Sequence, residues 1–303
     1  MADNETRSAV FAEGLLAGRA ALVTGGGTGL GRETAIELAR CGARVTIAGR
    51  RAETLAAAAK EIQREIGCAD GGQAGRVDWV AADVRERADA RRLVETALER
   101  MGRLDVLVNN AGGQYFTPAE GIALKGWRAV WRLNVEGMLN MSAAAVELGL
   151  GAGAQAGTAS QGGTIVNVTL SPHHGMPGMA HSGAARATVE ALTREMAERW
   201  SDRAIAVMAI AAGHFDTEAM GKYPETVRAG MARSVPMQRL GEPREHAWLV
   251  ALLCSPVGRA LNGSTITLDG ARDNWFGPWP PLGLTGGTGE VPTEARRPAP
   301  DIE

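Results

Sequence analysis

The chain has 303 residues, of which 45% are hydrophobic and 22% are charged, and its formal net charge at pH 7 is -2. This composition is that of an ordinary folded protein and excludes a wholly disordered chain. No hydrophobic run approaches the ~18–20 residues of a membrane span, and no dense patch of Lys and Arg is present, so we expect neither a membrane nor a nucleic-acid partner.

The N-terminal residues and the cysteines indicate the cellular compartment. No basic stretch leads into an apolar segment at the start of the chain, so we expect no secretory signal. Cys41, Cys68 and Cys254 form no CxxC pair and are odd in number, which is typical of the reducing cytoplasm. We expect no metal site, because His173 and His174 have no third ligand at a usable spacing.

Strand-like and helix-like segments alternate along the chain. The predicted strands are Arg19–Thr24, Ala43–Ala48, Val77–Ala82, Leu104–Asn109, Thr164–Thr169, Ala204–Ile210 and Ser264–Leu268. The predicted helices are one that ends near Leu38, then Ala52–Ile66, Glu86–Met101, Pro118–Leu148 and Ala184–Trp200. Continuous apolar strands are typical of a parallel sheet covered by helices on both faces. We therefore predict an α/β fold, a single doubly wound Rossmann-type domain.

Two ends with a different composition flank this domain. We expect residues 1–13 to be a flexible N-terminus, 14–273 to form the Rossmann-type domain, and 274–303 to form a C-terminal extension rich in Trp and Pro. Within the domain, the Gly/Ala-rich stretch Leu148–Gly163 is predicted to be a surface insertion.

A glycine-rich turn follows the first predicted strand and opens a helix. Glycines let the backbone approach a pyrophosphate, whose charge is bound by the free N–H groups of the helix N-terminus. The order strand, turn, helix favours a dinucleotide site. The residues expected to contact the cofactor here are Thr24, Gly25, Gly27, Thr28, Gly29, Leu30 and Gly31.

The end of the second strand indicates which dinucleotide is bound. An acidic residue there would bind the ribose 2′-OH of NAD, but this position is Gly49, followed by Arg50 and Arg51. A guanidinium suits a 2′-phosphate because it can pair with it in a bidentate manner. We predict NADPH as the cofactor; the alternative is that both arginines are solvated residues at a strand end.

The spacing TGxxxGxG, together with later motifs, resembles the short-chain dehydrogenase/reductase family. The motif AADV ends the third strand, NNAG follows the fourth, and LNVEG lies on the next helix. A Gly-His pair stands where the family usually has Pro-Gly. The resemblance implies further cofactor contacts from Asp83, Val84, Asn110, Ala111, Gly112, Gly213 and His214.

The catalytic positions depart from the usual pattern of that family. Most members carry a Ser, a Tyr about 13 residues later and a Lys four residues after it, but Thr169, Ser182 and Arg186 stand here. A carbonyl reductase must protonate an alkoxide, which a phenol beside a cation does well and Ser182 does not. Reduction of a C=C bond conjugated to a thioester instead collects charge on an enolate oxygen, which hydrogen-bond donors stabilise.

The residues that replace the usual Tyr and Lys belong to a longer pattern of motifs. HSGAAR, NNAGGQYFTPAE and KGW look like the trans-2-enoyl-CoA reductase branch of the family, which is close to the dienoyl-CoA reductases, and the resemblance covers roughly residues 14 to 272. It implies NADPH-dependent reduction of an enoyl-CoA-like thioester by hydride transfer to Cβ, in a homotetramer. It also implies a lid over Phe215–Val235, with apolar contacts from Met220, Tyr223 and Met231.

Five residues are therefore candidates for the chemistry. Arg186 is expected to donate to the nicotinamide ribose, as the family Lys does. Thr169 and Ser182 are expected to donate to the thioester oxygen, and Tyr115 is a candidate proton donor. Asn134 is expected to hold water or the adjacent strand. Two alternatives stay open: an enzyme of the same fold that acts on another enone, ketone or alcohol, and an NADP(H)-binding sensor or scaffold that has lost catalysis.

Overall fold

The computed structural model describes residues 6–67, 76–152, 162–171, 178–222 and 225–274. Its strands are β1 (Ala20–Thr24), β2 (Arg44–Gly49), β3 (Val77–Ala81), β4 (Val106–Asn109), β5 (Thr164–Leu170), β6 (Ala206–Ala212) and β7 (Thr265–Leu268). Its α-helices are α1 (Gly29–Arg40), α2 (Ala52–Glu65), α3 (Arg87–Met101), α4 (Leu124–Trp131), α5 (Gly137–Glu147), α6 (Ala180–Arg199), α7 (Glu225–Arg233) and α8 (Pro243–Cys254). No helix in these ranges is long and apolar enough to cross a membrane.

The seven strands form one parallel sheet in the order β3-β2-β1-β4-β5-β6-β7. The chain first runs outward from β1 to β3, then returns to β4 and runs outward to the opposite edge. The carboxyl ends of β1 and β4 therefore border a topological switch point, where ligands bind in doubly wound sheets. The predicted fold is confirmed, and the predicted strand ends agree with the structure to within two residues.

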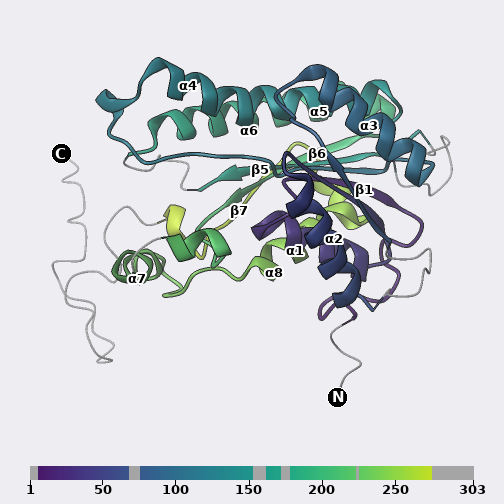
Figure 1. The fold of residues 1–303 in the computed structure, drawn as a ribbon, viewed down its shortest axis with the longest axis horizontal. Helices are drawn as coiled ribbons and strands as arrows, with labels where there is room; N and C mark the ends of the chain where they lie inside the picture. Colours follow the sequence, from purple (N-terminus) through teal and green to yellow (C-terminus); the bar gives the residue numbers. More distant parts are fainter. Residues whose placement is uncertain (1–5, 68–75, 153–161, 172–177, 223–224, 275–303) are drawn as a thin grey trace, which may run out of the picture.

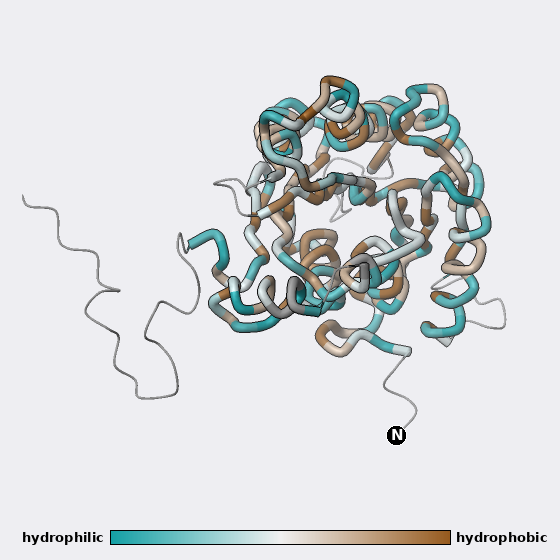
Figure 2. Tube along the Cα trace, turned by 60° about the vertical axis from the view of Figure 1, so that its left-hand side comes forward, coloured by the Kyte–Doolittle hydropathy of each residue, from teal (hydrophilic) through white to brown (hydrophobic). Residues whose placement is uncertain are grey.

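Helices cover both faces of the sheet (Figure 1), with α3, α4, α5 and α6 on one side and α1, α2 and α8 on the other. Each side holds its own cluster of buried hydrophobic side chains. Hydrophobic residues gather between the sheet and the helices, and hydrophilic ones lie outside (Figure 2). Every residue of β1 and of β6 is buried, as expected for central strands with two covered faces.

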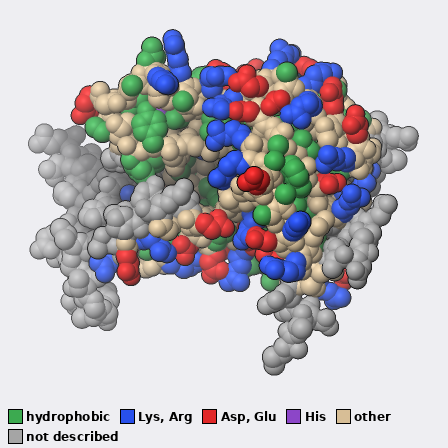
Figure 3. Space-filling view, in the orientation of Figure 1, with side chains coloured by type: hydrophobic (Ala, Val, Ile, Leu, Met, Phe, Trp, Pro, Cys, Tyr) green, Lys and Arg blue, Asp and Glu red, His purple; other side chains and the backbone are tan. Residues whose placement is uncertain are grey.

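Hydrophobic side chains also gather on the outer surface over α4 (Figure 3). Leu124 is 63% exposed and Trp127 is 36% exposed, and Leu139 on α5 is 37% exposed. Exposed large apolar side chains indicate an interaction surface where they form a contiguous patch.

The prediction of one continuous helix over Pro118–Leu148 is wrong. The structure has a short 3₁₀ turn, η1 (Ala119–Gly121), then α4, a π-helical segment η2 (Arg132–Glu136), and α5. The wider turn places the side chain of Asn134 inside the protein, where its amide donates to the carbonyl of Val130 at 2.7 Å. Such π segments occur frequently at functional sites.

Helix α6 also differs from its prediction, because it begins at Ala180, four residues before the predicted start at Ala184. The first turn of α6 therefore includes His181 and Ser182, which are both buried. Ser182 and Arg186, four residues apart, consequently lie on the same side of one helix.

A buried polar network connects the middle strands to the helices above them. The side-chain amide of Asn109 donates to Ser142 at 3.0 Å and to Asn167 at 2.9 Å, and the amide of Asn167 donates to Thr193 at 2.9 Å. All four residues are buried, and they join β4, β5, α5 and α6 directly below the carboxyl ends of the strands. Each of these hydrogen bonds gives a partner to a buried polar group that would otherwise be costly to bury, while the side-chain oxygen of Asn109 has no partner among the described residues.

We predict that Asn167→Ala lowers the free energy of unfolding by about 1–3 kcal/mol, because it leaves the buried amide of Asn109 with one partner fewer. Chemical denaturation followed by circular dichroism measures this change. The control is Asp202→Ala, at an exposed position outside the core, which should change stability by less than about 0.5 kcal/mol. Equal midpoints for the two variants would contradict the role of the network.

Candidate active site

A cavity of about 280 Å³ lies between the glycine-rich turn and the ends of β2, β3 and β4. This volume is close to the lower limit for ligand pockets. The cavity brings together residues from four separate motifs. The predicted cofactor residues that line it are Gly25, Gly27, Thr28, Arg50, Arg51, Asp83, Val84, Asn110, Ala111 and Gly112. Of the other predicted residues of the turn, Gly29 and Leu30 line a second cavity. Thr24 and Gly31 do not line the first cavity but contact the residues that shape the turn.

Thr24 and Asn110 fasten the glycine-rich turn to the end of β4. The hydroxyl of Thr24 accepts hydrogen bonds from the backbone amides of Asn110 and Ala111, at 3.1 and 3.0 Å. The side-chain amide of Asn110 donates to the carbonyl of Thr24 at 3.0 Å. A Cβ atom on Gly31 would lie 2.4 Å from the side chain of Asn110 and from the carbonyl of Gly25, so only glycine allows this approach.

The first turn of α1 binds an acidic group of the chain itself. The amide of Gly29 donates to the carboxylate of Glu218 at 3.0 Å, and the same carboxylate lies 3.7 Å from the guanidinium of Arg32. Glu218 begins the 3₁₀ segment η4 (Glu218–Lys222). This contact shows that the N-terminus of α1 presents an amide suited to an anion such as a pyrophosphate.

Two guanidinium groups at the border of the first cavity are available to a phosphate. The side chains of Arg50 and Arg51 are exposed, and neither guanidinium forms a salt bridge or a hydrogen bond with another described residue. Arg85, in contrast, donates to the carboxylate of Asp83, and these hydrogen bonds lower the pKa of Asp83. The first cavity therefore has two guanidinium groups at its border that can pair with an anionic ligand.

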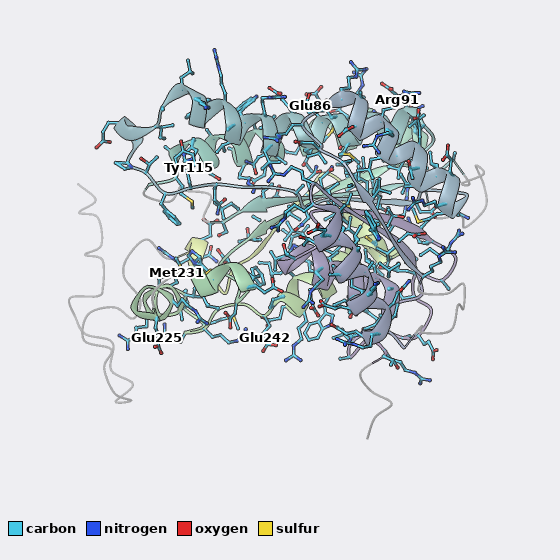
Figure 4. All side chains as sticks on the ribbon, viewed as in Figure 1. Glu86, Arg91, Tyr115, Glu225, Met231 and Glu242 are labelled. Carbon is cyan, nitrogen blue, oxygen red and sulfur yellow. The ribbon has the colours of Figure 1, made fainter. Side chains whose placement is uncertain are left out.

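The second cavity has a volume of about 680 Å³ and continues from the first, past Asn110 and Gly112, toward the predicted lid. Its far wall is apolar and includes Met220 and Met231, two of the three predicted lid contacts. Figure 4 shows Met231 on α7, opposite the loop that carries Tyr115 beneath α4. The residues with polar side chains that line this cavity are Asn110, Gln114, Thr169, Arg186, His214 and Thr217.

Arg186 lies at the junction of the two cavities. Its guanidinium donates to the carbonyl of Val168 at 2.6 Å and lies against Gly112, where a Cβ atom would be 2.6 Å from Nη2. Burial lowers the pKa of Arg186 to about 10, and the nearby carboxylate of Glu190 opposes this effect. The side chain is therefore a cation at neutral pH, placed where the family lysine is expected.

The hydroxyl of Thr169 does not have the predicted orientation. It donates to the carboxylate of Glu190 at 2.8 Å, and Thr169 itself is 3% exposed. Because a hydroxyl has one hydrogen, this bond removes the donor that was expected to face a thioester oxygen. The expectation for Thr169 is corrected accordingly.

Ser182 does not line the second cavity but forms a hydrogen bond with Gln114, which does. Its hydroxyl donates to the side-chain oxygen of Gln114 at 3.2 Å, and Ser182 is fully buried. Gln114 lines the cavity, and its loop is held by Asn134, which donates to the carbonyl of Gly113 at 2.9 Å and accepts from its amide at 3.2 Å. Asn134 thus holds the adjacent loop. Sequence reasoning missed Gln114, although it directly follows the motif NNAGG.

Tyr115 is placed away from the second cavity, which corrects its assignment as a proton donor. Its ring centre lies 4.4 Å from that of His181, and its hydroxyl lies over Gly126 of α4, where a Cβ atom would be 2.0 Å from it. His181 is buried, and neither of its ring nitrogens has a hydrogen-bond partner among the described residues. Burial lowers the pKa of His181.

Gly213 and His214 follow β6, as predicted, and both line the second cavity. Burial lowers the pKa of His214, and the charge of Arg272 lowers it further. In the part of the chain that the structure describes, no three His, Cys, Asp or Glu residues are grouped closely enough to hold a metal ion. The predictions for Cys68, His173, His174, Tyr223, residues 153–161 and residues 275–303 concern positions outside the described residues.

Comparisons with known proteins agree with this arrangement. Residues 25–271 match the family model described as "Enoyl-(Acyl carrier protein) reductase". The chain is 36% identical over 268 residues to the Bacillus subtilis protein named "Probable 2,4-dienoyl-CoA reductase", with 86% of this chain and 98% of that protein covered. It is 33% identical over 264 residues to a peroxisomal 2,4-dienoyl-CoA reductase of Arabidopsis thaliana, with 86% of each chain covered.

A solved structure extends the similarity to the fold. A short chain dehydrogenase from Burkholderia cenocepacia, in complex with NADP, has a TM-score of 0.73 and 29% sequence identity, with 84% of this chain and 98% of that chain covered. Since the match spans most of the chain and the sheet has the same architecture, the chain belongs to the short-chain dehydrogenase/reductase family and is an NAD(P)-dependent oxidoreductase.

Proposed function

We propose that the protein reduces the C=C bond of an enoyl-CoA-like thioester and uses NADPH. The observation that carries this proposal is the side chain at the family's tyrosine position. Ser182 is buried there and donates to Gln114, so the group that reaches the cavity is a carboxamide and not a phenol. The 2,4-dienoyl-CoA reductases among the relatives support the same substrate class.

The dihydronicotinamide of NADPH, when bound, supplies a hydride to Cβ of the substrate. Negative charge then collects on the thioester oxygen, which needs fixed hydrogen-bond donors. Gln114 and Arg186 both line this cavity and carry side-chain N–H donors. Ser182 orients Gln114 because it occupies the carboxamide oxygen and leaves the NH₂ group for the substrate. The proton at Cα comes from a side chain or from water.

The same groups are poorly suited to a ketone. An alkoxide must be protonated by an acid whose pKa lies near the working pH. Arg186 has a pKa of about 10, Gln114 does not titrate, and burial lowers the pKa of His214. Donors that stabilise an enolate without giving up a proton are therefore what this cavity provides.

The choice of NADPH rests on Arg50 and Arg51, which border the first cavity and whose guanidinium groups form no salt bridge with another described residue. A guanidinium without a protein partner is a good ligand for a 2′-phosphate. The NADP complex of the Burkholderia cenocepacia relative supports this choice.

We predict that Arg50→Ala weakens NADPH binding and leaves NADH binding nearly unchanged. Loss of a charged hydrogen bond typically costs ~1.5–3 kcal/mol, or roughly 10- to 150-fold in affinity. Titration of each cofactor, followed by fluorescence, measures both dissociation constants. Arg44→Ala, at the start of the same strand β2 but outside the cavity, is the control. Equal affinities of the unaltered protein for NADPH and NADH would refute the assignment.

The proposed reaction itself is tested by comparing two substrates. We expect NADPH oxidation with an enoyl-CoA to exceed that with the corresponding 3-oxoacyl-CoA by roughly 10²–10⁴-fold, the usual contribution of a positioned acid. Initial rates over a series of chain lengths give kcat/KM for each substrate. Comparable turnover would favour a ketoreductase, and NADPH binding with no turnover of either would favour a sensor or scaffold.

We expect Gln114→Leu, which keeps the size of the side chain and removes both donors, to lower kcat by about 10²-fold. Steady-state kinetics with an enoyl-CoA measure this loss. The matched control is the adjacent Tyr115→Phe, which removes a hydroxyl that lies over α4. An equal loss in the two variants would place the oxyanion donor elsewhere.

Two further properties belong to the same proposal. A homotetramer is supported by the exposed hydrophobic side chains Leu124, Trp127 and Leu139 over α4 and α5 (Figure 3). A cytoplasmic location is supported by the free thiols of Cys41 and Cys254.

A further inference from the structure

The contact between Glu218 and the start of α1 joins the predicted lid to the glycine-rich turn. The carboxylate of Glu218 accepts a hydrogen bond from the amide of Gly29 at 3.0 Å and lies 3.7 Å from the guanidinium of Arg32. The two hydrogen-bond partners are 189 positions apart in the sequence. The lid therefore places a negative charge of the chain at the positive end of a helix dipole.

Helix α1 has no local group that caps its first amides. The side chain of the N-cap residue Thr28 makes no capping hydrogen bond, and the first turn holds no acidic residue. In doubly wound folds the amides at the start of this helix bind the pyrophosphate of a dinucleotide. Because one amide hydrogen serves one strong acceptor, Glu218 and a pyrophosphate compete for the amide of Gly29.

Residues on both sides of Glu218 in the sequence line the second cavity. Thr217 and Met220 form part of its wall, and so do Gly29 and Leu30 at the start of α1. Among the described residues, Glu218 makes the hydrogen bond and the ion pair that join η4 to α1. This carboxylate therefore connects two parts of one cavity wall.

The chain before η4 is anchored at a separate place. Phe215 forms a parallel bridge with Gly241, and the carbonyl of Gly241 accepts a hydrogen bond from the amide of Asp216 at 2.9 Å. The amide of Gly241 donates to the carbonyl of His214 at 2.8 Å. Loss of the contact at Gly29 therefore frees η4 from α1 and leaves the chain fastened at Phe215.

We propose that Glu218 is a latch between the lid and the cofactor site, which a bound dinucleotide opens when its pyrophosphate takes the amide of Gly29. Cofactor binding then releases η4 from α1 and changes one wall of the substrate cavity. By linkage, the latch lowers the affinity for the cofactor by the same factor by which the cofactor weakens the latch. The inference rests on the dinucleotide site and not on the thioester substrate, so it goes beyond the proposed function.

The first test measures cofactor affinity by fluorescence titration. In Glu218→Ala, which removes the competing acceptor, we expect NADPH to bind about 2- to 5-fold more tightly, the effect of an anion at a helix N-terminus. NADH should gain by the same factor, because both cofactors carry the pyrophosphate. The gain in Glu218→Gln, which keeps an acceptor oxygen and removes the charge, should be smaller.

The second test follows the lid itself, by hydrogen exchange of peptides from η4 measured by mass spectrometry. Without cofactor, these peptides should exchange faster in Glu218→Ala than in the unaltered protein, because the contact with α1 is lost. With saturating NADPH the two proteins should exchange at the same rate, since the latch is then open in both. A difference that persists with NADPH bound would show that the pyrophosphate does not replace Glu218.

The matched control is Glu225→Ala, which removes an exposed carboxylate from α7 in the same lid (Figure 4). It should leave both affinities and the exchange of η4 unchanged. The side chain of Glu218 is 62% exposed, so its variants should fold, and thermal unfolding checks this. An affinity in Glu218→Ala that is unchanged or weaker would show a helix cap without a latch and overturn the proposal. A gain confined to NADPH, or an equal gain in Glu225→Ala, would also overturn it, because the effect would then be general charge repulsion.

Discussion

The guanidinium of Arg186 lies against the backbone of Gly112, and the two halves of the active site meet at this contact. Gly112 lines both cavities, so the loop after β4 separates the cofactor end from the substrate end. A side chain at Gly112 would push the guanidinium away and displace Asn134, whose carbonyl oxygen would lie 2.9 Å from the added Cβ atom. Because Gly112 has no side chain, Arg186 and Asn134 can both lie against the loop that follows β4.

The surroundings of Arg186 explain how the site can work without the family's tyrosine. A phenol combines two tasks, hydrogen bonding to the substrate oxygen and delivery of a proton. Here the buried hydroxyl of Ser182 donates to the carboxamide of Gln114, and Gln114 takes the place of the phenol as the hydrogen-bond donor in the cavity. The positive charge is supplied by the guanidinium of Arg186. Neither group readily gives up a proton at neutral pH, which suits the stabilisation of an enolate better than the protonation of an alkoxide.

The electrostatic balance of the site extends beyond the residues that line it. Arg186 is a desolvated cation, and the carboxylate of Glu190 on the same helix raises its pKa against the effect of burial. Glu218 accepts a hydrogen bond from the amide at the start of α1, and the guanidinium groups of Arg50 and Arg51 border the first cavity without a salt bridge to a described residue. Positive groups in this site thus either lie near a carboxylate of the chain or remain without a salt-bridge partner among the described residues.

The sequence by itself determined the fold class, the parallel sheet and the residues of the cofactor cavity, because these depend on local patterns: apolar runs, glycine spacing and short motifs at strand ends. It also showed that the tyrosine and lysine positions are replaced. It could not show that Tyr115 turns toward Gly126, that Thr169 donates to Glu190, or that Ser182 acts through Gln114, because each depends on contacts between residues 11 to 68 positions apart. The direction of a single hydroxyl hydrogen is decided by its nearest acceptor, and only the tertiary structure brings that acceptor into place.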